Sequence, residues 1–432
     1  MRSPTPTVPW ATEESTGEPE GRRFGRSSSR GRWIGLLGPA FVASIAYVDP
    51  GNVASNLSAG AEYGYLLVWV LVLANLMAVL VQYQSAKLGL VTGQSLPDIL
   101  GTSMRRGPRL AFWAQAEIVA AATDLAEIIG GALALHILFG VPLLWGGVIV
   151  GLLSMVLLMT QGPGSQHRFE GFVIGLLVII TIGFMVGLFV SPVDWPEAAR
   201  GIVPRFQDSQ SVLLAASMLG ATVMPHAIYL HSALVRDRHG TPTGRSEETT
   251  RRLVVATRWD VVLGLLIAGS VNIGMLLMAA AALPGVSGTD TIEGAAAAIS
   301  EHLGPAIGVI FAVGLLASGL ASTSVGCYAG SIIMNGLLRV RVPLLARRLV
   351  TMIPALLILA IGWDPTWSLV ISQVVLSLGI PFALIPLAVL TSRKRLMGRW
   401  ANPAWVKVLS VVVTLAIVSL NILLVVLTIA EL

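Results

Sequence analysis

Charged residues are scarce in this sequence of 432 amino acids: Asp, Glu, Lys and Arg make up 12% of it, while 55% is hydrophobic. Soluble domains usually carry about 25% charged residues. The shortage excludes an ordinary soluble protein and predicts a polytopic membrane protein. Cysteine is also nearly absent, since Cys327 is the only one. No internal disulfide can form, so helix packing has to hold the fold together.

The first thirty residues lack the apolar core of a signal peptide. Pro, Ser, Thr, Glu and Arg dominate them instead, and such a composition cannot bury a hydrophobic core. We therefore predict a disordered cytoplasmic tail over residues 1–30 and a transmembrane domain over residues 31–432.

Apolar stretches of about 20 residues, the length that crosses the hydrocarbon core of a bilayer, recur along the rest of the chain. We count eleven candidate spans. They lie near residues 33–58, 65–89, 110–139, 142–161, 169–191, 210–236, 255–283, 304–337, 346–363, 367–391 and 405–429.

Basic residues are distributed unevenly between the two sides of these spans. If the N-terminus is cytoplasmic, 26 of the 28 Lys and Arg residues fall on the cytoplasmic side, and only Arg200 and Arg205 do not. This asymmetry predicts a cytoplasmic N-terminus and an extracytoplasmic C-terminus. It also explains the net charge of +5 without a nucleic-acid partner.

Two spans are interrupted by proline beside polar residues. The first contains Asp49-Pro50-Gly51-Asn52 and the sixth contains Met224-Pro225-His226. Proline interrupts a helix, and irregular backbone inside a bilayer is tolerated only where it lines a cavity or a site. The breaks are five spans apart, an odd number, so the two spans run in opposite directions. This predicts an all-α transporter with inverted five-helix repeats. The repeats would cover about residues 33–191 and 210–391, and an extra helix about 405–429.

The side chains at the breaks suit a divalent transition metal. Asp49 is a functional candidate because a charge inside a membrane is costly; the alternative, that it caps the second half-helix, is compatible with this role. Asn52 follows on the same helix face, and carboxylate and amide oxygens bind divalent cations. A methionine such as Met224 usually serves packing, but its thioether is a soft ligand that suits Mn²⁺ or Fe²⁺ better than Mg²⁺ or Ca²⁺.

Three acids follow one another in the third span. The spacings of Glu117, Asp124 and Glu127 place them along one helix face. Together with His226 and His231 of the sixth span, they predict a proton relay. The alternative is a set of buried structural ion pairs.

Further polar residues mark the ninth and tenth spans. Arg347 and Arg348 begin the ninth span, where either is a counter-ion for the acids or an anchor at the inner surface. Gln373 places an amide inside the tenth span. For this amide, a helix–helix hydrogen bond and a role in the site are equally reasonable interpretations.

Three stretches together resemble the NRAMP family of divalent-metal transporters, and within it the proton-coupled bacterial manganese transporters. They are the residues at 49–52, those at 220–226 running to 229–232, and those at 314–319 running to 328–330. The resemblance covers essentially everything after the tail. It implies a LeuT-type fold in a bacterial plasma membrane, with two inverted five-helix repeats, an eleventh helix, and helices one and six broken at mid-membrane.

The resemblance also implies roles for individual residues. The side chains of Asp49, Asn52 and Met224 would bind the metal. The backbone carbonyls of Ala221 and Ala46 would join them, and the amide of Gln373 would approach when the site closes. A proton pathway would run through His226, Asp124, Glu127 and Arg348. Because Met224 is retained, the magnesium and aluminium branches of the family are disfavoured.

We therefore expect proton-coupled symport of Mn²⁺, with Fe²⁺ and Cd²⁺ or Co²⁺ as further substrates, into the cytoplasm by alternating access. No enzyme activity and no cofactor are expected, and the monomer should be the functional unit. One alternative is a LeuT-type sodium-coupled amino-acid symporter, although Asp49 would repel a substrate carboxylate. Another is an intramembrane metalloenzyme using His226 and His231, whose spacing of five differs from the i, i+4 pair of a zinc helix.

Overall fold

The computed structural model describes residues 38–159, 166–286, 288–289, 291–340 and 343–430. The predicted tail over residues 1–30 lies outside these ranges. Within them the chain forms helices and connecting segments without a strand. In the described ranges eight helices are long and apolar enough to cross a membrane, and shorter apolar helices accompany them. The predicted all-α membrane fold is confirmed.

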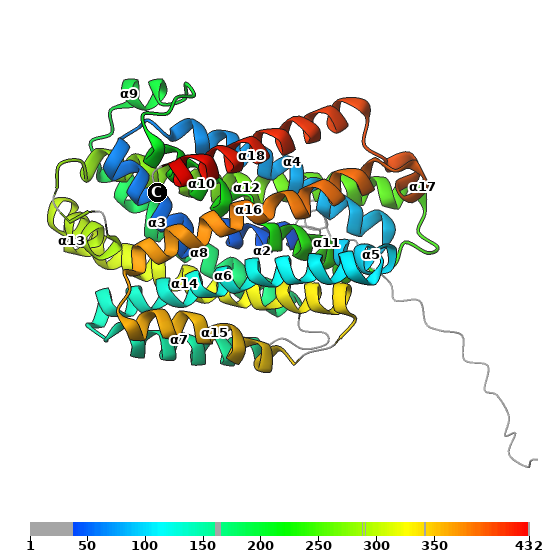
Figure 1. The fold of residues 1–432 in the computed structure, drawn as a ribbon, viewed down its shortest axis with the longest axis horizontal. Coiled ribbons are helices and arrows are strands. Elements are labelled where there is room, and N and C mark those ends of the chain that lie inside the picture. Colours follow the sequence, from blue (N-terminus) through cyan, green and yellow to red (C-terminus); the bar gives the residue numbers. More distant parts are fainter. Residues whose placement is uncertain (1–37, 160–165, 287, 290, 341–342, 431–432) are drawn as a thin grey trace, which may run out of the picture. The chain divides into compact units, whose positions relative to one another are not determined.

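The helices of the first half cover the first five predicted spans (Figure 1). They are α2 (Pro39–Ile45), the 3-10 turn η1 (Ala46–Val48), α3 (Pro50–Tyr63), α4 (Val68–Thr92), α5 (Leu96–Ser103), α6 (Arg106–Phe139), α7 (Leu143–Met159) and α8 (Gln166–Val190). Of these, α5 is a short helix between the second and third spans.

The helices of the second half cover the remaining six spans. They are α9 (Trp195–Arg200), α10 (Ser209–Thr222), α11 (Pro225–His239), α12 (Glu247–Ala282), α13 (Ile292–Leu303), α14 (Pro305–Ile333), the π-helical turn η2 (Met334–Leu338), α15 (Leu344–Ile361), α16 (Pro365–Ser392), α17 (Lys394–Met397), the 3-10 turn η3 (Gly398–Trp400) and α18 (Ala404–Ala430). Here α9, α13 and α17 lie between spans.

Both predicted helix breaks are present. After η1, Asp49 adopts an extended conformation with ψ 171°, and Pro50 begins α3. In the sixth span α10 ends at Thr222, Met224 is extended with ψ 122°, and Pro225 begins α11. Each proline occupies the first position of a helix, where its missing N–H removes no helical hydrogen bond.

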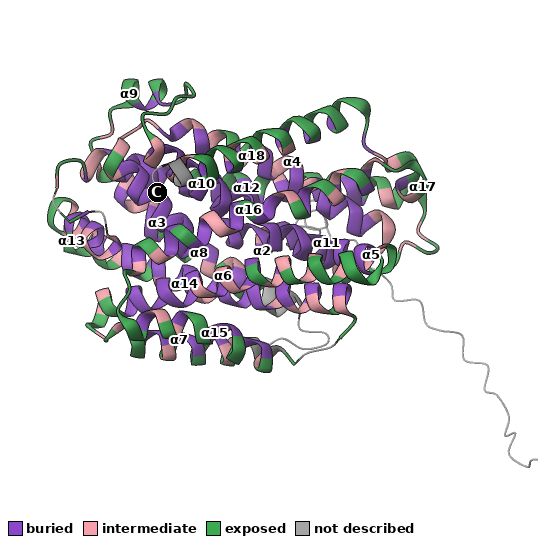
Figure 2. Ribbon diagram, in the orientation of Figure 1, coloured by how far each residue is buried: buried purple, intermediate pink, exposed green. Residues whose placement is uncertain are grey.

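The interrupted spans lie at the centre of the molecule and the last span at its edge. In its most apolar 18 residues the sixth span is 94% buried inside the protein, against 28% for α18. Buried residues fill the middle of the bundle, whereas α18 and the outer faces of α7 and α15 are largely exposed (Figure 2). Exposed apolar side chains such as Leu152 on α7 and Leu415 on α18 suit contact with lipid.

The first half-helix, α2, receives its N-terminal cap from a distant residue. Gly38, at its N-cap position, has no side chain to accept a hydrogen bond. Asp260 of α12 does so instead, accepting from the N–H groups of Gly38 at 3.0 Å and Ala40 at 2.9 Å. This carboxylate is only 2% exposed. It satisfies donors that a helix start leaves unpaired, so α2 is held against α12.

Helix α16 continues through a proline because α18 replaces the lost hydrogen bond. Pro381 lacks the N–H that would pair with the carbonyl of Ser377. The side chain of Asn421 on α18 donates to that carbonyl at 2.9 Å, and the hydroxyl of Ser377 donates back to the Asn421 side chain at 2.8 Å.

A second proline in α16 is compensated from the other side. Pro386 leaves the carbonyl of Phe382 without its helical donor, and the hydroxyl of Tyr229 on α11 lies 3.5 Å from it. Helix α16 is thus joined at its two interruptions to α18 and to the second half of the sixth span.

Candidate metal site

The two helix breaks meet through a network centred on Asn52. Asp49 Oδ1 accepts from the backbone N–H and from the side-chain Nδ2 of Asn52, each at 2.8 Å. The same Nδ2 donates to the carbonyl of Ala221 on α10 at 3.1 Å. The two interrupted spans are therefore linked at their breaks, as the inverted-repeat interpretation requires. Asp49 also caps α3, so the structural alternative is present, and its role as a metal ligand stays a prediction.

The two backbone carbonyls that the resemblance implies as metal ligands both lie one helical turn before a proline. Ala46 precedes Pro50 by four positions, and Ala221 precedes Pro225 by four. A proline at that distance has no N–H for the usual helical hydrogen bond. Both carbonyls are thus freed from the α-helical hydrogen bond by the prolines that start α3 and α11, although Ala46 lies in the 3-10 turn η1 and Ala221 accepts from Asn52.

The neighbouring carbonyls of the first break are bonded by other helices. Asn272 of α12 donates to the carbonyl of Tyr47 at 2.6 Å, and its side-chain oxygen accepts from Asn56 at 2.9 Å. Ser318 of α14 donates to the carbonyl of Val48 at 2.5 Å. These side chains hold the irregular backbone in place inside the membrane.

Gln373 of α16 covers the first break at a glycine. A Cβ on Gly51 would lie 1.8 Å from Gln373 Nε2, so only glycine allows this approach. A Cβ on Gly220 would lie 2.0 Å from the backbone oxygen of Gln373. Helix α16 therefore approaches both interrupted spans.

Three oxygens at this place are buried and, among the residues that the structure describes, lack a hydrogen-bond partner. They are Asp49 Oδ2, Asn52 Oδ1 and Gln373 Oε1. Buried polar atoms are nearly always bonded, and oxygens of these types are ligands for divalent cations. Asp49 is 1% exposed, and Asn52 and Gln373 are 0% exposed, so the site is closed to solvent.

Met224 lies in the extended link of the sixth span and is fully buried. It follows Ala221 by three residues, so it shares the second break with one of the freed carbonyls. Among the described residues, no group of three or more His, Cys, Asp or Glu could hold a metal ion. The candidate site instead combines one carboxylate with amide and carbonyl oxygens and a thioether.

The acids of α6 are paired with the two arginines of α15. Arg347 lies 3.1 Å from Glu117 and 3.8 Å from Asp124. Arg348 lies 3.3 Å from Asp124 and 4.0 Å from Glu127. The arginine side chains are 4% and 0% exposed, so both are counter-ions rather than surface anchors. Ion pairing accounts for their burial, and a relay role for the acids stays a prediction.

Two glycines of α14 make room for this cluster. A Cβ on Gly330 would lie 2.0 Å from Arg347 Cζ, and a Cβ on Gly326 would lie 2.7 Å from Glu127 Oε1. Gly330 belongs to the third stretch that carried the resemblance. A larger residue there would require the guanidinium of Arg347 to shift.

His226 connects the second break with the acids. Its Nδ1 lies 3.2 Å from the hydroxyl of Thr123, the residue next to Asp124 on α6. His226 is in the first turn of α11, directly after Pro225. The expected proximity of this histidine to the acids is therefore present.

His231 belongs to a different network from His226. His231 follows His226 by five residues, which corresponds to a rotation of about 140° around the helix. Its Nδ1 lies 2.8 Å from Gln82 Oε1 on α4. Gln82 in turn donates to the hydroxyl of Tyr47 at 2.5 Å. Two histidines on different sides of α11 are also poorly placed to bind one zinc ion.

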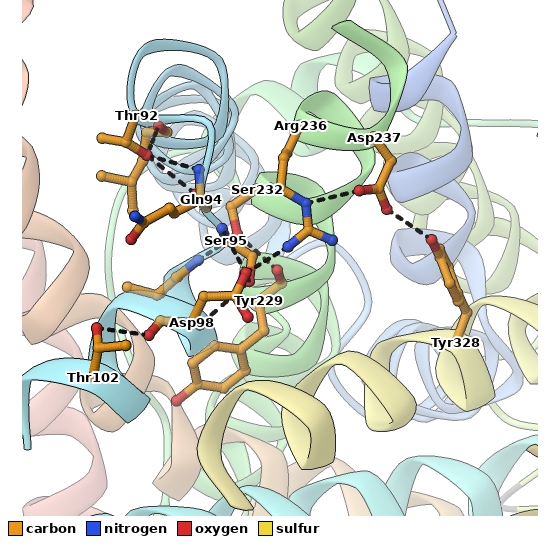
Figure 3. Close-up of polar contacts among 12 residues, drawn as sticks. Thr92, Gln94, Ser95, Asp98, Thr102, Tyr229, Ser232, Arg236, Asp237 and Tyr328 are labelled. Atoms are coloured by element: carbon orange, nitrogen blue, oxygen red, sulfur yellow. Dashed lines mark hydrogen bonds and ion pairs between the residues drawn. The ribbon is translucent and has the colours of Figure 1, made fainter. Parts of the chain in front are cut away.

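A polar cluster at the far end of α11 was not predicted from the sequence (Figure 3). Arg236 is paired with Asp98 of α5, and its Nε donates to Asp237 at 2.7 Å. The hydroxyl of Tyr328 on α14 donates to Asp237 at 3.0 Å. This cluster joins α5, α11 and α14 at the end that the positive-inside rule assigns to the cytoplasm. In the sequence, Arg236 is indistinguishable from the other arginines of that side.

If the acid–arginine cluster is the proton relay that the sequence predicts, Gly330→Ala should weaken its effect on transport, because the new Cβ would displace the guanidinium of Arg347. We expect metal uptake to lose most of its dependence on external pH while metal binding is retained. Uptake measured across a pH series would show this. Gly175→Ala on α8 is the control, since its Cβ would have no atom of the described part of the chain within 4 Å. An unchanged pH profile in the Gly330 variant would contradict the predicted relay role.

Two interrupted spans that meet at buried oxygens in an all-α membrane protein are typical of transporters of the inverted-repeat type. The family model for Nramp, described as natural resistance-associated macrophage protein-like, matches residues 40–427. The chain belongs to this family. It is therefore a transporter of divalent metal ions rather than an enzyme, and the alternatives of an amino-acid symporter and a metalloenzyme are set aside.

Relatives along the whole domain agree with this membership. The divalent metal cation transporter MntH of Mycobacterium tuberculosis strain H37Rv is 56% identical over 404 residues, which cover 94% of each chain. MntH of Bacillus subtilis strain 168 is 44% identical over 394 residues, covering 90% of this chain and 92% of that one.

Solved structures agree on the fold. A manganese transporter of Eremococcus coleocola superposes with a TM-score of 0.80 at 29% identity, covering 95% of this chain and 88% of that one. MhsT in complex with L-phenylalanine, with a TM-score of 0.58 at 14% identity, shares the fold alone. The expected LeuT-type fold is confirmed.

Proposed function

We propose that the protein imports Mn²⁺ together with protons by alternating access, with Fe²⁺ and Cd²⁺ or Co²⁺ as further substrates. The observation that carries this proposal is the group of unpartnered oxygens on Asp49, Asn52 and Gln373, buried where the two helix breaks meet. The relatives' names, which specify divalent metal cations or manganese, support it.

In this proposal the metal exchanges part of its water shell for protein ligands. The side chains of Asp49, Asn52 and Met224 bind it, and the carbonyls of Ala221 and Ala46 complete the set. Gln373 approaches from α16 when the site closes. The thioether favours Mn²⁺ and Fe²⁺ over the abundant hard cations Mg²⁺ and Ca²⁺, which a transporter has to reject.

A proton would leave Asp49 when the metal binds, because a bound cation favours the ionised carboxylate. His226 contacts Thr123, the residue next to Asp124, and would connect the break with the acids of α6.

From Asp124 the row of ion pairs continues towards the half-buried Glu117, with Arg348 and Glu127 beside it. We propose this row as the proton pathway to the cytoplasm. His231 lies in the separate network with Gln82, and we propose that it tunes the pathway from there.

The proposed setting is a bacterial plasma membrane, with a cytoplasmic N-terminus, an extracytoplasmic C-terminus and a functional monomer. The distribution of Lys and Arg supports this orientation. The Asp98–Arg236–Asp237–Tyr328 cluster would then fasten the cytoplasmic end of α11 and would have to open for release.

Uptake into proteoliposomes tests the proposed function. With Mn²⁺, Fe²⁺, Mg²⁺ and Ca²⁺ offered separately, we expect uptake of the first two only. An acidic exterior should accelerate Mn²⁺ uptake, and the interior should acidify as metal enters. Empty liposomes are the control for leakage. Equal uptake of Mg²⁺ would contradict the proposed selectivity, and Mn²⁺ uptake without proton movement would contradict symport.

A further inference from the structure

A large groove lies on the outside of the bundle, away from the metal site. It has a volume of about 540 Å³ and runs between α5, α6 and the second half of α16. Most of its lining is apolar. The side chains that matter below are Met104, Phe112, Phe382, Ile385, Val389 and Arg393. Phe382, Ile385 and Val389 are 45–47% exposed although they belong to a membrane span, so this wall of the groove faces the hydrocarbon of the bilayer.

The length of the groove matches one leaflet of a membrane. Its lining on α16 extends from Pro381 to Arg393. Twelve helical steps of about 1.5 Å correspond to roughly 18 Å. Half of a hydrocarbon core of about 30 Å is roughly 15 Å. The groove therefore reaches from the membrane surface to about its midplane.

The end of the groove at the membrane surface is basic on both walls. Arg393 lines it, and Lys394 follows Arg393 in the chain. On the opposite wall, Arg105 and Arg106 follow directly after Met104. All four are exposed, and within the described part of the chain none of them has an ion pair with a carboxylate. Unpaired cations beside an apolar groove attract an anionic headgroup.

The size of the groove favours a lipid chain over a protein helix. A helix about 10 Å wide and 18 Å long occupies roughly 1,400 Å³, well above the volume of the groove. A helix of a second copy would thus leave most of its surface outside, whereas an extended acyl chain fits within.

We propose that this groove is a binding site for an anionic phospholipid of the cytoplasmic leaflet. An acyl chain lies along Phe382, Ile385 and Val389, and the phosphate is bound by Arg393, assisted by the neighbouring Lys394 and by Arg105 and Arg106. Because α16 also carries Gln373, the lipid contacts the same helix that covers the metal site, but its binding does not depend on the metal being transported.

Native mass spectrometry of the full-length protein with added lipid tests this site. We expect retention of phosphatidylglycerol over phosphatidylcholine in the unmodified protein. In Arg393→Gln/Lys394→Gln the preference should fall by about fivefold for each charge removed. Arg251→Gln is the matched control, because Arg251 is an exposed arginine of α12 on the same predicted side but outside the groove. That variant should keep the preference.

A second variant tests the apolar part independently of charge. Val389→Trp should fill the groove and lower binding of both lipids, while mass and elution show a folded monomer. Equal retention of the two lipids by the unmodified protein would overturn the proposal, as would an unchanged preference in the double variant. If Val389→Trp converts a dimer to a monomer without altering lipid retention, a second copy occupies the groove and the proposal is wrong.

Discussion

Asp49→Ala is expected to abolish Mn²⁺ uptake in proteoliposomes, lowering the initial rate by at least about 100-fold. Loss of an outer-shell partner of a metal typically costs about 10–100-fold, and Asp49 is the only carboxylate of the proposed ligand set. Without it, no negative charge offsets the divalent ion at the breaks. Asp49→Asn should be similarly inactive, because it keeps an oxygen for capping α3 but removes the charge.

A second aspartate distinguishes the metal-ligand role of Asp49 from a role as a helix cap alone. Asp208 caps α10 through the N–H of Ser211 at 2.8 Å. That bond, together with one from the hydroxyl of Tyr63, holds the pKa of Asp208 below its ordinary value, so it is ionised at neutral pH. Asp208→Ala removes a comparable cap from an interrupted span but leaves the metal site intact. We expect it to retain uptake, and equal loss in both variants would count against the metal-ligand role.

Met224→Ala should change which ions are transported rather than whether transport occurs. We expect Mn²⁺ uptake to persist, while the ratio of Mn²⁺ to Ca²⁺ uptake falls by about tenfold or more, equivalent to about 1.4 kcal/mol. The physical reason is that the remaining ligands are all oxygens, which hard cations prefer. Competition of Ca²⁺ with labelled Mn²⁺ measures the change directly.

A second buried methionine distinguishes the loss of a thioether ligand from the loss of packing. Met218 on α10 is 0% exposed, as Met224 is, but lies in the helix before the break. Met218→Ala also truncates a buried methionine and leaves a cavity. It should therefore lower the stability of the protein without altering its ion preference. The thioether argument would be refuted if both variants shift the ratio equally or if neither does.

The main features of the fold could be predicted from the local sequence. Pro50 and Pro225 interrupt apolar spans, and a proline acts on its own helix whatever surrounds it. For the same reason the breaks fall at the predicted residues. The spacing of Glu117, Asp124 and Glu127 also sufficed to place them on one face, where Arg347 and Arg348 pair with them.

Contacts between distant spans could not be read in this way. Asp260 caps α2 across 222 positions of the sequence, and nothing near it indicates that partner. The separation of His231 from the acids follows from helix rotation, yet whether α4 or α6 lies on that side depends on the packing of the whole bundle. The pairing of Arg236 with Asp98 is hidden for a similar reason, since basic residues are common on that side.

The bond between Asn421 and the carbonyl of Ser377 has a consequence for biogenesis. A membrane protein is synthesised from its N-terminus, so α16 enters the bilayer before α18 does. Until α18 docks, the carbonyl released by Pro381 has no donor from Asn421, and hydrocarbon offers no water to replace it. The proline-containing helix is therefore completed only by a helix made after it. The eleventh helix, α18, thus supplies the bond that completes α16 at Pro381.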